Sequence, residues 1–294
     1  MSAALGFGVS GPHGARWYSE GKLQRLIAAA VEGGVRHFDT APFYGAAEAR
    51  LGRALAGLGA GEVFVSTKTG TRRSGARAVK DFTEAGMRRD VEQSRRALGR
   101  DALDLIYLHG PSAAEIDAAF PVLVALKAEG KIKAFGVCGE GAPLVHALAE
   151  GADAIMGAYN FIDRRHEALF RQARAAGVMT VAITPLAQGA LAPPRGAPAL
   201  PSDYWRLGRR IVRGGSPRRR AEEAQSALAA ASGVPAFDAA LAFVMKGGLA
   251  DFVITTTTQP RHLAQTLTAA SRPIEPARLE ALFAARLDPA GARS

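Results

Sequence analysis

The sequence has little cysteine and no long apolar run. Its 294 residues include one cysteine, Cys138, so no disulfide can form within the chain. A lone thiol is typical of a reducing compartment, and we expect a cytoplasmic protein. No uncharged apolar stretch reaches the ~18 residues that a membrane-spanning helix needs. Because the first residues, MSAALGFGVSG, also lack the basic start and apolar core of a signal peptide, we expect no membrane partner.

Motifs for several other chemistries are also absent. The six histidines show no metal-binding spacing such as H-E-x-x-H, and Cys138 has no second cysteine with which to bind zinc. No G-x-x-x-x-G-K-[ST] loop is present, and no serine or cysteine stands in a recognisable nucleophile motif. We therefore expect no metal, no P-loop and no nucleophilic serine or cysteine.

Acidic residues are fewer than basic ones, 27 against 37, which gives a net charge of +10. Such a charge could indicate nucleic-acid binding. Seven arginines, however, lie within residues 206–220, a segment without an acid, and without these seven the chain carries only +3. A local cluster favours one anionic ligand over a polymer, or is simply a solvated surface loop. We expect no nucleic-acid partner.

Apolar residues make up 48 % of the chain, enough for a large core, and their spacing alternates between two periods. Short β-rich runs such as LDLIYLH at 103–109 are followed by runs of helical periodicity such as 113–130. Eight such units in about 250–300 residues predict an α/β protein with a closed (β/α)₈ TIM barrel. No linker divides the chain, so we expect residues 1–294 to form a single domain, with a long Pro- and Arg-rich loop at about 187–218.

One motif favours a different fold. GFGVSG, at residues 6–11, matches the G-x-G-x-x-G pattern of a dinucleotide-binding Rossmann domain. In that fold the motif opens a helix directly, and an acid closes a second strand ~20 residues later. Here Pro12 follows, the predicted helix begins near Gly21, and the candidate acid, Asp39, lies further away. The barrel therefore remains the prediction.

Four polar side chains fall at or beside the ends of neighbouring predicted strands. Asp39 ends HFD, Lys68 ends VSTK and His109 ends IYLH. Tyr44 lies in the loop after Asp39. The carboxyl ends of barrel strands carry active sites, so we expect these groups to meet at one mouth of the barrel. Each residue alone has a structural explanation, such as a turn or a helix cap, but four suitable types at adjacent strand ends favour a site.

These residue types indicate proton transfer. A phenol has a pKa near ~10 and is a poor proton donor at neutral pH unless a nearby cation lowers that pKa. Lys68 can supply the positive charge, and Asp39 can keep the lysine protonated and in place. His109 can orient a bound carbonyl, which makes Tyr44 a candidate general acid or base. Because a carbonyl also needs a hydride, which no side chain supplies, the group points to a nicotinamide cofactor.

Several segments resemble the aldo-keto reductase family. VRHFDTAPFYGAAEARLGRAL resembles its Asp-Thr-Ala, Tyr-Gly, Glu and Leu-Gly signature, VSTKTG its lysine strand, and RRALGRDALDLIYLHGP its histidine strand. EGKIKAFGV, AYNFIDRR and TPLAQGAL match later segments, so the likeness runs nearly end to end. The resemblance implies a catalytic tetrad of Asp39, Tyr44, Lys68 and His109, with NADP(H) or NAD(H) across the barrel mouth. Its form is closest to the bacterial aldose-dehydrogenase-like branch, which acts on sugars and small aldehydes.

The chain departs from the family where the nicotinamide carboxamide binds. The family usually has a Ser-Asn pair after the fifth strand and a Gln at the sixth, and the matching positions are Cys138, Gly139 and Met156. None of them is a strong hydrogen-bond partner for an amide. The aromatic residue that stacks on the ring aligns with Ile183, and we interpret Asn160 as structural support rather than a ligand.

The eighth strand departs as well. The family often grips the 2′-phosphate of NADP with a Lys-Ser and Arg pattern, and here Thr256, Thr257 and His262 stand at those positions. The threonines precede Pro260, a candidate first helical residue, so a helix N-terminus suited to phosphate is expected. Alternatively, the threonines are only the end of a strand. We expect NADP(H) rather than NAD(H). The implied cofactor contacts are Cys138, Gly139, Met156, Ile183, Thr184, Leu186, Thr255, Thr256, Thr257, Thr258, Arg261, His262 and Gln265.

Aromatic residues in the predicted loops are candidates for the substrate pocket. Trp17 follows the first strand, Phe43 adjoins Tyr44, and Trp205 lies in the long loop. Such side chains at a barrel mouth suit a sugar or an aromatic aldehyde equally, and each could instead be a packing residue that covers the barrel.

The prediction is an NAD(P)(H)-dependent oxidoreductase that transfers a hydride between nicotinamide and a small-molecule aldehyde, ketone or aldose. Two alternatives remain open. One is a non-redox acid–base enzyme, an eliminase or isomerase, that uses Tyr44 and Lys68 on the same barrel. The other is a non-catalytic ligand-binding barrel, which the complete tetrad disfavours, because a binding protein does not need a cation beside a phenol.

Overall fold

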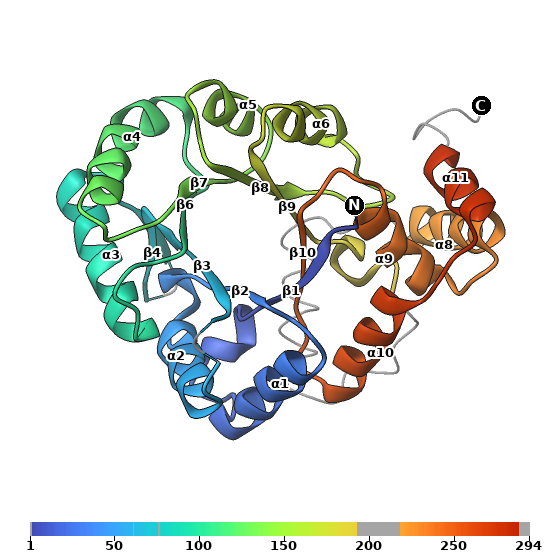
Figure 1. The fold of residues 1–294 in the computed structure, drawn as a ribbon, viewed down its shortest axis with the longest axis horizontal. Coiled ribbons are helices and arrows are strands. Elements are labelled where there is room, and N and C mark those ends of the chain that lie inside the picture. The colour runs from blue at the N-terminus through green and yellow to red at the C-terminus, as the bar shows by residue number, and fades with distance from the viewer. Residues whose placement is uncertain (1, 61, 76, 193–217, 288–294) are drawn as a thin grey trace.

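The computed structural model describes residues 2–60, 62–75, 77–192 and 218–287. Eight parallel strands form a closed barrel with the helices outside it (Figure 1), which confirms the predicted (β/α)₈ fold. The barrel closes by pairing of its first and last strands. In chain order the barrel strands are β1 (Ala4–Gly8), β2 (His37–Asp39), β3 (Phe64–Thr69), β6 (Leu105–His109), β7 (Phe135–Cys138), β8 (Ala154–Ala158), β9 (Met179–Ile183) and β10 (Phe252–Thr255).

Helices cover the outside of the ring, and two of them form an extra layer. In Figure 1, α8 and α11 lie outside α9. The helices of the ring are α1 (Glu20–Glu32), α2 (Ala47–Gly57), α3 (Glu84–Leu98), α4 (Ala113–Ala128), α5 (Ala142–Ala149), α6 (Glu167–Ala175), α9 (Ala236–Lys246) and α10 (Pro260–Ser271), and the extra pair is α8 (Arg218–Ser232) and α11 (Pro276–Ala284).

Every second side chain of a strand points into the barrel, because side chains alternate between the two faces of each strand. These inward side chains give the barrel interior an apolar side and a polar side. The polar side comes from β2 and β3, whose His37, Asp39, Ser66 and Lys68 are all buried. The interior therefore concentrates its charge beside two adjacent strands. The apolar side, from β6 to β10, contains Leu105, Tyr107, Cys138, Ala154, Met156, Val181 and Ile254.

The glycines of the G-x-G-x-x-G match serve barrel closure. A Cβ on Gly6 would lie 2.4 Å from Ile254 Cδ1, and one on Gly8 would lie 2.4 Å from Thr256 Oγ1. Gly6 pairs with Ile254 in the parallel register of β1 and β10. These glycines let β10 approach β1, and the closed barrel excludes the Rossmann alternative.

The barrel carries a hairpin that the sequence did not predict. An antiparallel hairpin, β4 (Thr71–Ser74) and β5 (Arg77–Lys80), follows β3. It is tied to the end of β6, because Thr71 Oγ1 donates to the His109 carbonyl at 2.7 Å and Lys80 Nζ donates to the Gly110 carbonyl at 2.7 Å. The hairpin therefore lies at the same barrel mouth as the predicted site.

The predicted loop at about 187–218 is described only at its two ends. A short 3₁₀ helix, η3 (Ala187–Gly189), begins it, and α8 begins at Arg218. Most of the arginine cluster and Trp205 lie outside the described residues. Across the described ranges no single helix is long and apolar enough to cross a membrane, although one pair, α8 with α9, meets the length and composition requirements despite a 75° bend.

Candidate active site

Asp39 and Lys68 form a buried ion pair at the carboxyl ends of β2 and β3. Lys68 Nζ donates to Asp39 Oδ1 at 2.8 Å and Oδ2 at 2.7 Å, and to the Thr40 carbonyl at 2.9 Å. Ser66 Oγ donates to Asp39 Oδ1 at 2.9 Å. Lys68 is 1 % exposed and Asp39 5 %. These hydrogen bonds offset the cost of removing the two charges from water.

Tyr44 and His109 lie beside this pair. Lys68 Nζ is 5.4 Å from the centroid of the Tyr44 ring. The Tyr44 and His109 rings have centroids 6.1 Å apart, at an angle of 75°. The strands of Asp39, Lys68 and His109 are neighbours in the barrel. The structure thus brings the four predicted catalytic residues together at one mouth.

The charge state of Lys68 is set by two opposing effects. Burial lowers the pKa of the ammonium, but the carboxylate of Asp39 raises it, helped by Tyr44 and Cys138. The net effect raises the pKa of Lys68 above its ordinary value. Lys68 is therefore a permanent cation at neutral pH, and a cation favours the ionised form of a neighbouring phenol.

His37 precedes Asp39 by two residues and therefore lies on the same face of β2. Its Nε2 is 2.8 Å from Ser66 Oγ, and the rings of Phe64 and Phe252 lie edge-on to it at 5.0 Å and 4.5 Å. Burial, followed by the positive charge of Lys68, lowers the pKa of His37 to about 3. His37 is therefore neutral at pH 7 and does not compete with Lys68 for the carboxylate.

Two buried carboxylates hold β3 from the helix side. Thr67 Oγ1 donates to Glu48 Oε1 of α2 at 2.6 Å, and Thr69 Oγ1 donates to Asp90 Oδ2 of α3 at 2.9 Å. Desolvation by burial is the largest effect on both carboxyl groups and raises the pKa of each. Because Thr67 and Thr69 flank Lys68, these bonds fix the height and rotation of the lysine. Neither role was predicted from the sequence, although Glu48 belongs to the signature that resembles the family.

Tyr44 is placed by a close contact between two loops. It ends a 3₁₀ helix, η2 (Pro42–Tyr44), which meets a second one, η1 (Gly11–Gly14). A Cβ on Gly14 would lie 1.5 Å from the Tyr44 carbonyl oxygen, so only glycine fits. Ala46 N donates to the Gly14 carbonyl at 3.1 Å, and Gly45 has a φ of 68°. The backbone path on both sides of Tyr44 therefore depends on these glycines.

The predicted carboxamide positions lie on the apolar side of the mouth. Cys138 and Met156, at 8 % and 1 % exposure, belong to the apolar cluster inside the barrel, which Ile183 adjoins. Gly139 donates its backbone N–H to the Met156 carbonyl at 3.1 Å. Neither a thioether nor a thiol is a strong partner for an amide. These side chains therefore fit the flat, apolar part of a nicotinamide better than its carboxamide.

The segment after β9 has an unusual backbone. Thr184, Ala187 and Gln188 have φ values of 56°, 46° and 57°. Asn160 Nδ2 donates to the Thr184 carbonyl at 3.0 Å, and Asn160 Oδ1 accepts the backbone N–H groups of Ile162 and Asp163. Asn160 thus supports the turn, and the predicted contacts Thr184 and Leu186 lie on this strained segment. Non-glycine residues with positive φ are costly and cluster at functional sites.

The predicted phosphate site lies where β10 meets α10. Pro260 is the first residue of α10, and Thr257 Oγ1 accepts the Gln259 N–H at 3.1 Å. The Thr257 carbonyl is 3.0 Å from His13 Nε2, and the Tyr18 hydroxyl donates to the Thr258 carbonyl at 3.3 Å. Thr255 Oγ1 donates to the Gly6 carbonyl at 3.4 Å, whereas Thr256 is exposed.

The backbone N–H groups that start α10 suit a cofactor phosphate. The other predicted contacts on α10 are Arg261, His262 and Gln265.

The predicted substrate residues lie in different settings. The Phe43 ring is 5.8 Å from the His109 ring at 89°, so Phe43 adjoins the tetrad. Trp17 is 50 % exposed and packs edge-on against Tyr18 at 6.2 Å. Within the described ranges no group of three or more metal-binding side chains occurs.

Comparisons with known proteins agree with this geometry. The chain matches the model of the Aldo/keto reductase family over residues 4–285. It is 36 % identical over 161 residues to D-threo-aldose 1-dehydrogenase of Pseudomonas sp, a match that covers 46 % of the chain and 49 % of that relative. It is 28 % identical over 219 residues to L-galactose dehydrogenase of Arabidopsis thaliana, covering 68 % and 67 %. The match thus spans about half the length of the first of these relatives.

Among solved structures, the aldo-keto reductase AKR11C1 of Bacillus halodurans in its holo form has a TM-score of 0.74 at 24 % identity, over 98 % of this chain and 94 % of that one. This likeness shows the fold. The family match spans nearly all of the described barrel and both halves of its mouth, so the chain belongs to the aldo/keto reductase family. The resemblance seen in the sequence is confirmed.

Proposed function

We propose that the protein is an oxidoreductase that transfers a hydride between NAD(P)(H) and an aldehyde, ketone or aldose, with Tyr44 as general acid or base. The observation that carries the proposal is the Lys68 ammonium, bound by Asp39 at 2.7 Å and lying 5.4 Å from the Tyr44 ring. Family membership supports the reaction class.

Each residue of the tetrad has one task. In reduction, the Tyr44 hydroxyl donates its proton to the carbonyl oxygen, and Lys68 stabilises the phenolate that remains. In oxidation the phenolate removes the proton of the alcohol. His109 adjoins Tyr44 and Phe43, so it orients the substrate oxygen by a hydrogen bond. Bound nicotinamide supplies or accepts the hydride.

The predicted cofactor-binding residues fit the phosphate end of the cofactor better than the carboxamide of its nicotinamide. The start of α10, with Thr256 and Arg261 exposed, suits an anionic phosphate and supports NADP(H) over NAD(H). The carboxamide end has Cys138 and Met156 in an apolar setting. We therefore expect binding through the phosphates and the ring face, which a fluorescence titration with NADPH and NADH measures directly.

The aldose part of the proposal is supported by the relatives, of which one is a D-threo-aldose dehydrogenase and another an L-galactose dehydrogenase. Phe43, placed against His109, offers an apolar surface to a sugar ring. A buried single cysteine, Cys138, fits a cytoplasmic enzyme.

Replacing Tyr44 tests the mechanism. Tyr44→Phe removes only the hydroxyl, and we expect turnover to fall by about 10²–10⁴-fold with unchanged cofactor binding. Tyr107→Phe is the matched control, because Tyr107 is buried inside the same barrel and its hydroxyl has no hydrogen-bond partner among the described residues. Near wild-type turnover in Tyr44→Phe refutes the proposal.

One observation favours a second candidate function. The apolar carboxamide positions suit an enzyme that has lost redox chemistry and keeps Tyr44 and Lys68 for elimination or isomerisation. Failure of both NADPH and NADH to bind, together with loss of activity in Tyr44→Phe, selects this candidate.

A further inference from the structure

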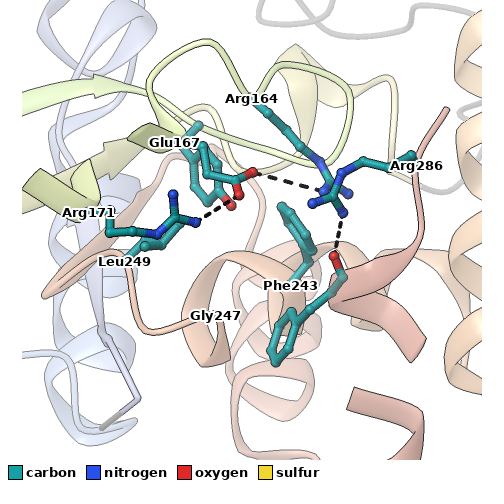
Figure 2. Close-up of a pocket in the computed structure, with 9 residues that line it drawn as sticks. Arg164, Glu167, Arg171, Phe243, Gly247, Leu249 and Arg286 are labelled. Atoms are coloured by element: carbon teal, nitrogen blue, oxygen red, sulfur yellow. Dashed lines mark hydrogen bonds and ion pairs between the residues drawn. The ribbon is translucent and has the colours of Figure 1, made fainter. Parts of the chain in front are cut away.

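A cavity of about 320 Å³ lies on the outer wall of the barrel, between α6 on one side and α9 with α11 on the other (Figure 2). None of the tetrad residues lines it. Arg164, Glu167 and Arg171 line one side, and Phe243, Phe283 and Arg286 line the other. The cavity therefore combines guanidinium groups with aromatic surface and is separate from the tetrad.

The lining carries an excess of positive charge. Two of the three guanidinium groups share the carboxylate of Glu167, which is 3.1 Å from Arg171 and 4.0 Å from Arg164. Arg286 donates to the carbonyls of Phe283 and Ala285, and no carboxylate among the described residues lies within 4.0 Å of it. Figure 2 shows the ends of Arg164 and Arg286 next to one another. The local balance is two positive charges in excess.

Arg164 is held rigidly in this position. Its guanidinium lies 4.4 Å from the Phe243 ring centroid and 4.9 Å from that of Phe161, and Nη2 donates to the Ala285 carbonyl at 2.7 Å. Burial, followed by the charge of Arg286, lowers the pKa of Arg164. A fixed guanidinium loses little side-chain entropy when it binds an anion, and an anion would relieve the repulsion between the two arginines.

The shape and chemistry select the ligand. A phosphate or carboxylate matches the planar fork of a guanidinium. The remaining wall, with Phe243, Phe283 and Leu249, suits a small ring or chain attached to that anionic group. We propose that this cavity binds a small organic anion, a phosphate or carboxylate that carries an apolar ring or chain.

Calorimetric titration of the full chain with phenyl phosphate tests the proposal, with and without NADPH. We expect binding to wild type in both conditions, no binding of benzyl alcohol, and inorganic phosphate weaker by at least about tenfold because it lacks the ring. Arg286→Gln should weaken phenyl phosphate by at least about tenfold. Glu167→Gln should tighten it, because a competing carboxylate is removed.

Arg165→Gln is the matched control, since Arg165 is exposed, pairs with Asp163 and Glu140, and does not line the cavity. The Arg165→Gln variant should bind phenyl phosphate with the same affinity as the wild type. Equal affinity in Arg286→Gln, equal affinity for inorganic phosphate, or loss of binding when NADPH is present would each overturn the proposal. The Tyr44→Phe result decides the proposed catalytic function separately, because turnover does not enter this titration.

Discussion

The barrel mouth and the outer arginine cavity both place a cation against an aromatic ring, but they balance its charge differently. Lys68 is 1 % exposed, and its Nζ lies 5.4 Å from the Tyr44 ring centroid. Its charge is balanced by the carboxylate of Asp39, 2.7 Å away. Arg164 lies 4.4 Å from the Phe243 ring and shares Glu167 with Arg171. A fully compensated cation can stay in place and act on a neighbouring phenol. An incompletely compensated one attracts a ligand.

The two regions should differ most in how much stability the protein loses when the carboxylate beside the cation is removed. Asp39→Asn leaves the Lys68 ammonium buried without its counter-charge, and we expect a loss of about 3–5 kcal/mol in the free energy of unfolding. Glu167→Gln should change it by less than about 1 kcal/mol, because Arg171 is largely exposed to water. Denaturant unfolding of both variants measures the difference. Equal losses would mean that the two pairs have the same role.

The second largest difference between the barrel and the arginine cavity should be in how their residues make stability depend on pH. The pKa of His37 is about 3 in the folded chain against 6.5 unfolded, because burial lowers it most and Lys68 lowers it further, while Asp104 raises it. The unfolded chain therefore binds more protons between these values, so this contribution is complete above pH 6.5 and falls as pH decreases. At pH 5 the loss is about 2 kcal/mol, at about 1.4 kcal/mol per pH unit.

His37→Gln cannot titrate, so its unfolding free energy should depend less on pH across this window than that of the wild type. Denaturant unfolding at pH 7, 6 and 5 compares the two slopes. Because His37 lies in the barrel, Arg286→Gln should keep the wild-type slope. An unchanged slope in His37→Gln would show that other groups dominate.

A smaller effect should follow from the placement of Tyr44. Gly14→Ala forces the Tyr44 carbonyl away from a Cβ that would lie 1.5 Å from it, so the phenol shifts relative to Lys68. We expect kcat to fall by about tenfold or more, since small misplacements of catalytic groups are costly. Gly21→Ala in α1 is the control, because a Cβ there would lie 3.7 Å from Arg25 Nη1, an ordinary contact, and this variant should keep full activity.

The smallest effect is expected at the rim of the arginine cavity. Arg171→Gln removes an exposed i,i+4 pair with Glu167, which is worth about 0.3–0.5 kcal/mol. Thermal unfolding in low and high salt should show that this contribution is screened, whereas the Lys68–Asp39 pair is not. A salt-independent effect of Arg171→Gln would place the pair in a more buried setting.

Much of the mouth could be predicted because its residues follow strands in the sequence. Asp39, Lys68 and His109 each end an apolar run, and parallel strands in a barrel bring their carboxyl ends together. The hairpin formed by β4 and β5 was not predicted, because its residues are mostly polar and do not show the alternation of apolar and polar residues that indicates a strand. Nor were the roles of Glu48 and Asp90, because hydrogen bonds from helices to β3 have no periodic signature.

Apolar periodicity and strand-end chemistry, both local properties of the chain, were enough to indicate the barrel and the family tetrad. Three-dimensional contacts decided the rest. Gly14 must be glycine only because another loop passes close to it. Arg164, near the start of α6, meets Arg286, beyond the end of α11, only because the helices on the outer wall converge. Charges distant in sequence acquire an energy of interaction when folding removes the water between them.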